Sequence, residues 1–210
     1  MPRLCPPAKL DAAMELSEDD LDEGLDALAV LVRKYAKDPR VRYAYGVSLL
    51  DADRTAEALE HLEFAERRGR DLDRAEALQQ AYFELGMIVH AERLLQRTGG
   101  DLNEAIDVEA EMLRNHGPGW RELPRKDLLA FERARVSAVR RRSDAVAELT
   151  RLARRQPGWC ALQIARAGVA LTAGDVETFY EAAAAALEAG PDDAQALLHA
   201  ARAAFLREGT

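Results

Sequence analysis

The chain has 210 residues, with 29 Lys or Arg and 37 Asp or Glu, so its formal net charge is −8. Its charged fraction of 31% and the lack of any long apolar run exclude a membrane-spanning helix, and its first residues lack a secretory apolar segment. Cys5 and Cys160 lie too far apart in the sequence to indicate a disulfide framework or a paired metal site. We therefore expect one cytoplasmic domain spanning residues 1–210.

Helix-forming residues dominate the chain. Ala, Leu, Arg and Glu are frequent, and β-branched or aromatic residues do not alternate as they do in strands, so the sequence predicts an all-α fold. Glycines and prolines divide the chain into about twelve expected helices. In chain order these cover 8–16, 18–36, 39–51, 54–68, 72–85, 87–97, 102–115, 125–141, 143–155, 158–173, 175–189 and 192–207.

Several expected helices begin beside a residue that can cap unpaired main-chain amides. We expect such starts at Ser17, Thr55, Asp101 and Ser143, each followed by acidic residues. The connections between the expected helices are short, so neighbouring helices should be antiparallel.

The helices recur with a period near 34 residues. Pro124, Pro157 and Pro191 are 33 and 34 positions apart. In the N-terminal half, a small residue followed four positions later by Leu recurs at the same spacing. Small residues allow two helices to cross closely, and the Leu then packs beside the crossing. The small residues are Gly24, Ala58 and Ala91, and the leucines are Leu28, Leu62 and Leu95.

This pattern resembles the tetratricopeptide repeat (TPR) family. The best single repeat contains Asp38-Pro39, Tyr43, Tyr45-Gly46, Leu49-Leu50, Glu57-Ala58-Leu59, Leu62 and Ala65. The resemblance implies a right-handed α-solenoid of antiparallel helix pairs. We expect repeats in 1–98, an irregular insertion or change of register in 99–123, and further repeats with a capping helix in 124–210. Residues 70–123 fit two registers, one pairing 72–85 with 87–97 and the other pairing 87–97 with residues 100–112.

The resemblance also implies a function. Stacked helix pairs form a concave groove, and the family uses that groove to bind peptides or protein segments without catalysis. No phosphate-binding loop, dinucleotide motif or nucleophile elbow is present in the sequence. His61 lies one helical turn after Glu57, but two ligands do not make a metal site, so we expect no metal, cofactor or catalytic residue. Two alternatives stay open: a structural or self-associating protein with a self-filled groove, and an enzyme of unfamiliar chemistry.

Charge is unevenly distributed along the chain. Residues 1–66 contain 8 basic and 15 acidic residues and have a net charge of −7, whereas residues 121–155 contain 11 and 5 and have +6. The arginines of the basic segment either neutralise helix C-termini or attract an acidic partner segment. An overall acidic chain with few aromatic residues argues against nucleic acid as a partner. A homodimer is a further alternative.

In the TPR family the first helix of each repeat lines the groove. We assign groove positions in this chain from their phase within each expected first helix. In one repeat these are Tyr43, Val47 and Leu50. In another they are Leu128, Phe131 and Arg135, with Arg141 and Arg142 beside them. The corresponding face after Pro157 is Ala161, Ile164, Gly168 and Leu171. The alternative is that the apolar members of these sets pack in the core.

Overall fold

The computed structural model of the chain describes residues 4–69, 71–99 and 107–208. Over these residues the regular structure consists of twelve α-helices and one short 3₁₀ helix, without strands, which confirms the all-α prediction. The elements are α1 (Pro7–Asp19), α2 (Leu21–Lys34), α3 (Pro39–Asp51), α4 (Thr55–Arg68), α5 (Leu72–Glu84), α6 (Ile88–Thr98), α7 (Val108–His116), η2 (Trp120–Glu122), α8 (Arg125–Ser137), α9 (Arg142–Arg155), α10 (Cys160–Ala173), α11 (Val176–Ala189) and α12 (Ala194–Glu208). No helix in the described ranges is both long and apolar enough to cross a membrane.

The chain forms two compact units. Unit 1 comprises residues 1–85 and 90–102, and unit 2 comprises residues 86–89 and 103–210. That the whole chain acts as one domain and winds into one right-handed superhelix stays a prediction. The alternative register of 70–123 depends on residues 100–106, which lie outside the described residues.

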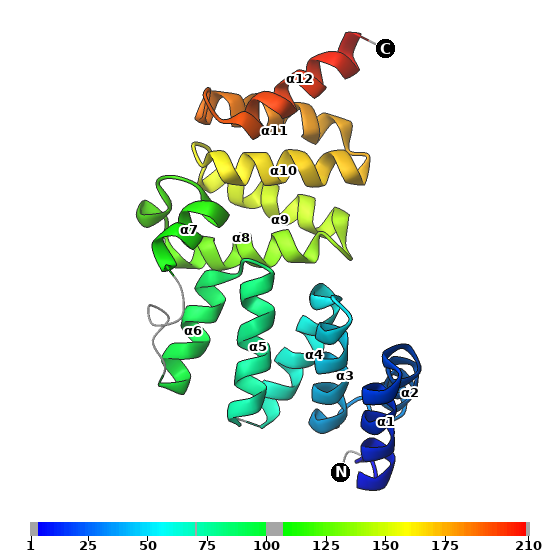
Figure 1. Ribbon diagram of the computed structural model, residues 1–210. Coiled ribbons are helices and arrows are strands. Elements are labelled where there is room, and N and C mark those ends of the chain that lie inside the picture. The colour runs from blue at the N-terminus through cyan, green and yellow to red at the C-terminus, as the bar shows by residue number, and fades with distance from the viewer. Residues whose placement is uncertain (1–3, 70, 100–106, 209–210) are drawn as a thin grey trace. The chain divides into compact units, whose positions relative to one another are not determined.

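Within each unit, helices pack against their neighbours in chain order. In unit 1, α1 packs on α2, α2 on α3, α3 on α4 and α4 on α5, and α3 also contacts α1 and α5. In unit 2 the same ladder runs from α8 to α12, and α10 also contacts α7 and α12 (Figure 1). Stacking of this kind, in which each helix contacts mainly its sequence neighbours, is the arrangement of a helical-repeat protein.

Each unit has its own apolar core. In unit 1 Leu28 and Val41 are fully buried and pack with Leu10 and Tyr35. In unit 2 Phe179 is fully buried among alanines of α10 and α11, namely Ala167, Ala170, Ala182 and Ala183. Burying one Leu or Phe side chain contributes about 1.5–3 kcal/mol, so these clusters stabilise each unit.

Aspartates cap six of the twelve helices that the structure describes. Their carboxylates accept hydrogen bonds from main-chain amides of the first turn. The predicted caps at Ser17, Thr55 and Ser143 are wrong because Ser17 lies inside α1 and Thr55 and Ser143 lie inside the first turns of α4 and α9. Asp101 lies outside the described residues. The capping residues are Asp20, Asp38, Asp71, Asp107, Asp175 and Asp193.

Candidate protein-binding groove

An open groove of about 810 Å³ lies in unit 2. Its walls come from α8, α10, the end of α7 and the turn between α11 and α12. Most of the lining is apolar, and Leu113, Phe131 and Ile164 provide its largest apolar side chains. We call this feature the unit 2 groove; it is lined by residues 113–115, 117–118, 131, 135, 160–161, 164–165, 168–169, 189–193 and 195.

The groove is open because α10 presents small residues to it. Ala161, Ala165 and Gly168 recur at helical spacing along the side of α10 that lines the groove. A Cβ atom built on Gly168 would meet only the His199 ring, at 3.9 Å, so this position has free space beside it. Residues three or four apart in a helix share a face, and small side chains there leave room for a ligand.

Charged side chains line part of the groove. Arg114 and Arg135 come from α7 and α8, and Asp192 and Asp193 come from the turn before α12. Asp193 also caps α12 by accepting hydrogen bonds from two main-chain amides. The groove therefore offers apolar contacts together with groups of both charges.

Arg135 lines the groove and also forms hydrogen bonds that connect two neighbouring segments of the chain. Its guanidinium donates hydrogen bonds to the main-chain oxygens of Gly86 (3.0 Å) and Asn115 (3.2 Å) and to the Asn115 side chain (3.2 Å). Burial lowers the pKa of the Arg135 guanidinium, and the nearby Glu132 carboxylate opposes that effect. Arg135 thus holds the end of α7 and the turn at Gly86 in place.

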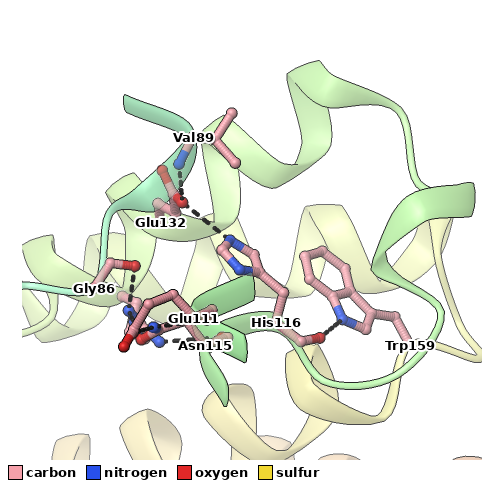
Figure 2. A network of polar contacts seen from close by, with 8 residues as sticks. Gly86, Val89, Glu111, Asn115, His116, Glu132 and Trp159 are labelled. Carbon is pink, nitrogen blue, oxygen red and sulfur yellow. Dashed lines mark hydrogen bonds and ion pairs between the residues drawn. The ribbon is translucent and has the colours of Figure 1, made fainter. Parts of the chain in front are cut away.

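A buried polar network fixes α7 against α8 and α10 (Figure 2). Nε2 of His116 lies 3.0 Å from Oε1 of Glu132, and the same carboxylate oxygen accepts a hydrogen bond of 2.8 Å from the amide of Val89. The indole of Trp159 donates a hydrogen bond of 2.7 Å to the carbonyl oxygen of His116. The rings of Phe131 and Trp159 pack against each other beside this contact, with centroids 4.5 Å apart.

The histidine–carboxylate pair in this network is a structural contact. Both side chains are 0% exposed, and neither belongs to the lining of the unit 2 groove. A general acid or base must reach the substrate proton directly or through one water, which the burial of His116 and Glu132 prevents. Among the described residues, no group of three or more His, Cys, Asp or Glu side chains is placed to hold a metal ion.

The structure brings only some of the predicted site residues together. Phe131 and Arg135 line the unit 2 groove, and so do Ala161, Ile164 and Gly168. Leu128 is buried at 5% exposure and Phe131 at 1%, so both also belong to the core. Arg141 and Arg142 are exposed at the start of α9 and are not among the groove-lining residues.

Tyr43, Val47 and Leu50 lie in unit 1, on a separate groove of about 370 Å³ between α3 and α5. Acidic residues line this second groove, among them Asp73 and Glu76. Burial raises the pKa of the Tyr43 hydroxyl, and the neighbouring carboxylates add to the increase. The two groups of predicted residues therefore belong to two grooves of different chemistry.

Helix phase did not predict two walls of the unit 2 groove. One wall contains Leu113 at the end of α7 with Gly117 and Pro118 in the turn after it, and the other contains Gly190 and Asp192 in the turn before α12. Helix phase predicts which face of a regular repeat lines a groove, but it does not predict where an irregular segment docks. The one available signal was the run His116-Gly117-Pro118-Gly119, which marks an interruption of the repeat.

No protein-family model matches the chain, and no curated protein matches it either. Among solved structures, YrrB, described as a TPR protein with an unusual peptide-binding site, is similar at 18% identity and a TM-score of 0.41, covering 91% of this chain and 89% of YrrB. The TPR domain of P58(IPK) is similar at 13% identity and a TM-score of 0.41, covering 96% of this chain and 66% of that one. A thermophilic TPR protein from Thermus thermophilus is similar at 21% identity and a TM-score of 0.36, covering 94% of this chain and 98% of that one.

Proposed function

We propose that the chain is a non-catalytic, cytoplasmic protein–protein interaction module that binds a partner segment in the unit 2 groove. The observation that carries the proposal is the open, mainly apolar groove of about 810 Å³ beside Phe131, Ile164 and Gly168. Peptide-binding sites of helical proteins combine apolar pockets with a few polar groups that fix orientation. The two free thiols, Cys5 and Cys160, fit a reducing compartment.

The partner segment should combine apolar side chains with acidic ones. Apolar side chains fit the floor formed by α10, and an acidic side chain is attracted by the basic segment 121–155, whose net charge is +6. Peptides that bind the chain can be selected from a random library displayed on phage, and their sequences show which chemistry the groove prefers. We expect the recovered peptides to be enriched in large apolar residues flanked by Asp or Glu.

Two glycine substitutions test whether such a peptide occupies the groove. Gly168→Leu fills the space beside α10, where a Cβ meets only the His199 ring at 3.9 Å, so the helix should form while the groove closes. Gly158→Leu is the matched control because Gly158 is exposed, has open space around its Cβ and is not a groove-lining residue. We expect the Kd of the selected peptide to rise about tenfold or more in Gly168→Leu and to stay unchanged in Gly158→Leu. Equal peptide affinity in both variants, measured by fluorescence anisotropy, would contradict the proposal.

A further inference from the structure

His199 is a buried histidine without a hydrogen-bond partner in the described part of the chain. It is 6% exposed and lies on α12, which packs against α10 and α11. Its Nδ1 is buried and bonded to no group, and none of the described residues hydrogen-bonds to Nε2. Nearly all buried polar side chains in folded proteins are hydrogen-bonded, because leaving one unpaired costs stability. A role outside the packing of the free chain would account for His199.

The ring of His199 borders the unit 2 groove. A Cβ atom built on Gly168 would meet Cε1 and Nε2 of His199, each at 3.9 Å, and Gly168 lines the groove. Gln195 lies one helical turn before His199 on the same side of α12, and it lines the groove as well. Because Gly168 has no side chain, this residue does not cover Nε2. A ligand at Gly168 therefore reaches the Nε2 edge of the ring.

The surroundings of His199 keep its imidazole neutral. Burial lowers the pKa of His199, and the positive charge of Arg202 on the next turn of α12 lowers it further. The ring also forms a T-shaped contact with the uncharged ring of Phe179 in α11, with centroids 6.1 Å apart. A neutral imidazole has one N–H donor and one acceptor nitrogen. The apolar floor beside Gly168 makes a charged ligand group costly at this point, whereas an amide or hydroxyl costs less.

We propose that His199 is a specificity-determining residue of the unit 2 groove, where its Nε2 forms a hydrogen bond with an uncharged polar side chain of the bound segment. The proposal rests on the proposed function, because it assigns one contact within the same groove. It adds an Asn, Gln, Ser or Thr to the apolar and acidic residues expected in that segment. A segment with an apolar residue at this position leaves the imidazole unpaired and binds less tightly.

Replacing His199 by leucine separates a binding role from a structural one. Because His199 has no hydrogen-bond partner in the free chain, His199→Leu should leave the urea unfolding midpoint unchanged or raise it. His61 is the matched control, since it is 8% exposed but its Nδ1 lies 3.1 Å from Nη1 of Arg42. His61→Leu should therefore lower the midpoint. A lower midpoint in His199→Leu would show that the ring stabilises the free chain, and it would overturn the proposal.

The affinity of the phage-selected peptide, measured by fluorescence anisotropy, provides the second test. We expect its Kd to rise about tenfold in His199→Leu. His199→Gln should retain most of the affinity, because the glutamine amide can take the place of Nε2 and can donate or accept a hydrogen bond. His61→Leu should bind the peptide as the wild type does.

The result in Gly168→Leu distinguishes failure of this proposal from failure of the proposed function. Peptide binding that Gly168→Leu weakens and His199→Leu leaves unchanged would overturn the contact with His199 and keep the groove as the binding site. Binding that Gly168→Leu leaves unchanged would contradict the proposed function, and the contact with His199 with it.

A double-mutant cycle identifies the group that His199 contacts. Each Asn, Gln, Ser or Thr of the selected peptide is replaced in turn by an apolar residue of similar size. We expect one replacement to weaken binding to the wild-type chain about tenfold and to weaken binding to His199→Leu hardly at all. Coupling to an Asp or Glu of the peptide instead, or to none of its side chains, would overturn the proposal.

Discussion

Asp38 holds two segments of unit 1 together. Its carboxylate is fully buried and accepts hydrogen bonds from the amides of Cys5 (2.8 Å) and Arg40 (3.0 Å) and from the Arg40 guanidinium (2.9 Å). Arg40 also donates a hydrogen bond of 2.8 Å to the carbonyl oxygen of Cys5. The segment that precedes α1 is thereby fixed to the start of α3. Burial by itself would raise the pKa of Asp38, but these hydrogen bonds outweigh burial and hold the pKa below its ordinary value of 3.8.

The lowered pKa predicts how the contribution of Asp38 depends on pH. A carboxyl group whose pKa is lower in the folded state stabilises the fold above about pH 4 and loses that effect as the pH falls through the folded-state pKa. We expect Asp38→Asn to reduce the free energy of unfolding by about 1–3 kcal/mol at pH 7. The difference from wild type should shrink at pH 3.

Urea unfolding followed by far-UV circular dichroism at pH 7 and pH 3 measures the effect. Asp26→Asn removes an exposed carboxylate from α2 and controls for the loss of charge alone. A difference between Asp38→Asn and wild type that is the same at both pH values would show that the carboxylate charge does not matter.

At the scale of helices, close crossings depend on small residues. A Cβ atom on Gly24 in α2 would overlap the main chain of Ser17 in α1. On Gly46 in α3 it would lie 2.7 Å from a methyl group of Leu62 in α4. Ala58, which the sequence places at the repeat position of Gly24, is also fully buried. The small residues that recur in the sequence thus lie where helices meet.

Two glycine-to-alanine substitutions should change stability in opposite directions. Gly24→Ala forces α1 and α2 apart, because the obstacle is main chain that has no alternative rotamer, and we expect a loss of about 1–3 kcal/mol. Gly168→Ala meets only the His199 ring at 3.9 Å and lies inside α10, so it should stabilise by about 0.5–1 kcal/mol. Urea unfolding midpoints measured by circular dichroism show whether each substitution stabilises or destabilises the protein. A tolerated Gly24→Ala would mean that the α1–α2 crossing is looser than described.

The same helices show what the sequence could predict. The spacing of Gly, Pro and apolar residues predicted all twelve helices, because these features act within a few residues of each other along the chain. The caps were predicted poorly, since serines at 17 and 143 and aspartates at 20 and 38 carry equivalent local signals. In the structure the aspartates are the N-caps, because helix packing and not the local sequence sets where each helix begins.

The candidate site was only partly predictable. Helix phase within a repeat predicts the position of Phe131, Arg135 and Ile164, so the sequence could place them on the groove-lining face. The docking of α7 through His116, Glu132 and Trp159 involves residues 16 to 43 positions apart in the chain, and it was not predictable from local pattern. Its buried histidine–carboxylate contact became visible only when the packing was known.

At the scale of the whole molecule, charge is the main asymmetry. The N-terminal segment 1–66 has a net charge of −7, and the segment 121–155 that forms η2, α8 and α9 has +6. Within the basic segment, Asp127 is buried and pairs with Arg155 at 2.7 Å, and Arg142 donates a hydrogen bond of 3.4 Å to Thr172 near the end of α10. Arg142 thus lies beside a C-terminal carbonyl of α10, where a cation is favoured, whereas Arg155 forms an ion pair between α9 and α8. Arg141 is exposed and is available to an incoming partner.

If the basic segment attracts an acidic partner, removing exposed arginines should slow association with the selected peptide. Exposed charges steer the encounter and are screened over about 10 Å at 0.1 M salt, so the effect should depend on ionic strength. We expect Arg141→Ser with Arg142→Ser to reduce the association rate several-fold at low salt and much less near about 0.5 M salt, with little change in dissociation. Lys9→Ser with Lys37→Ser is the control, because it removes the same charge from exposed positions of unit 1. Stopped-flow fluorescence measures both rates. Wild-type association rates at every salt concentration would show that these two arginines do not attract the partner.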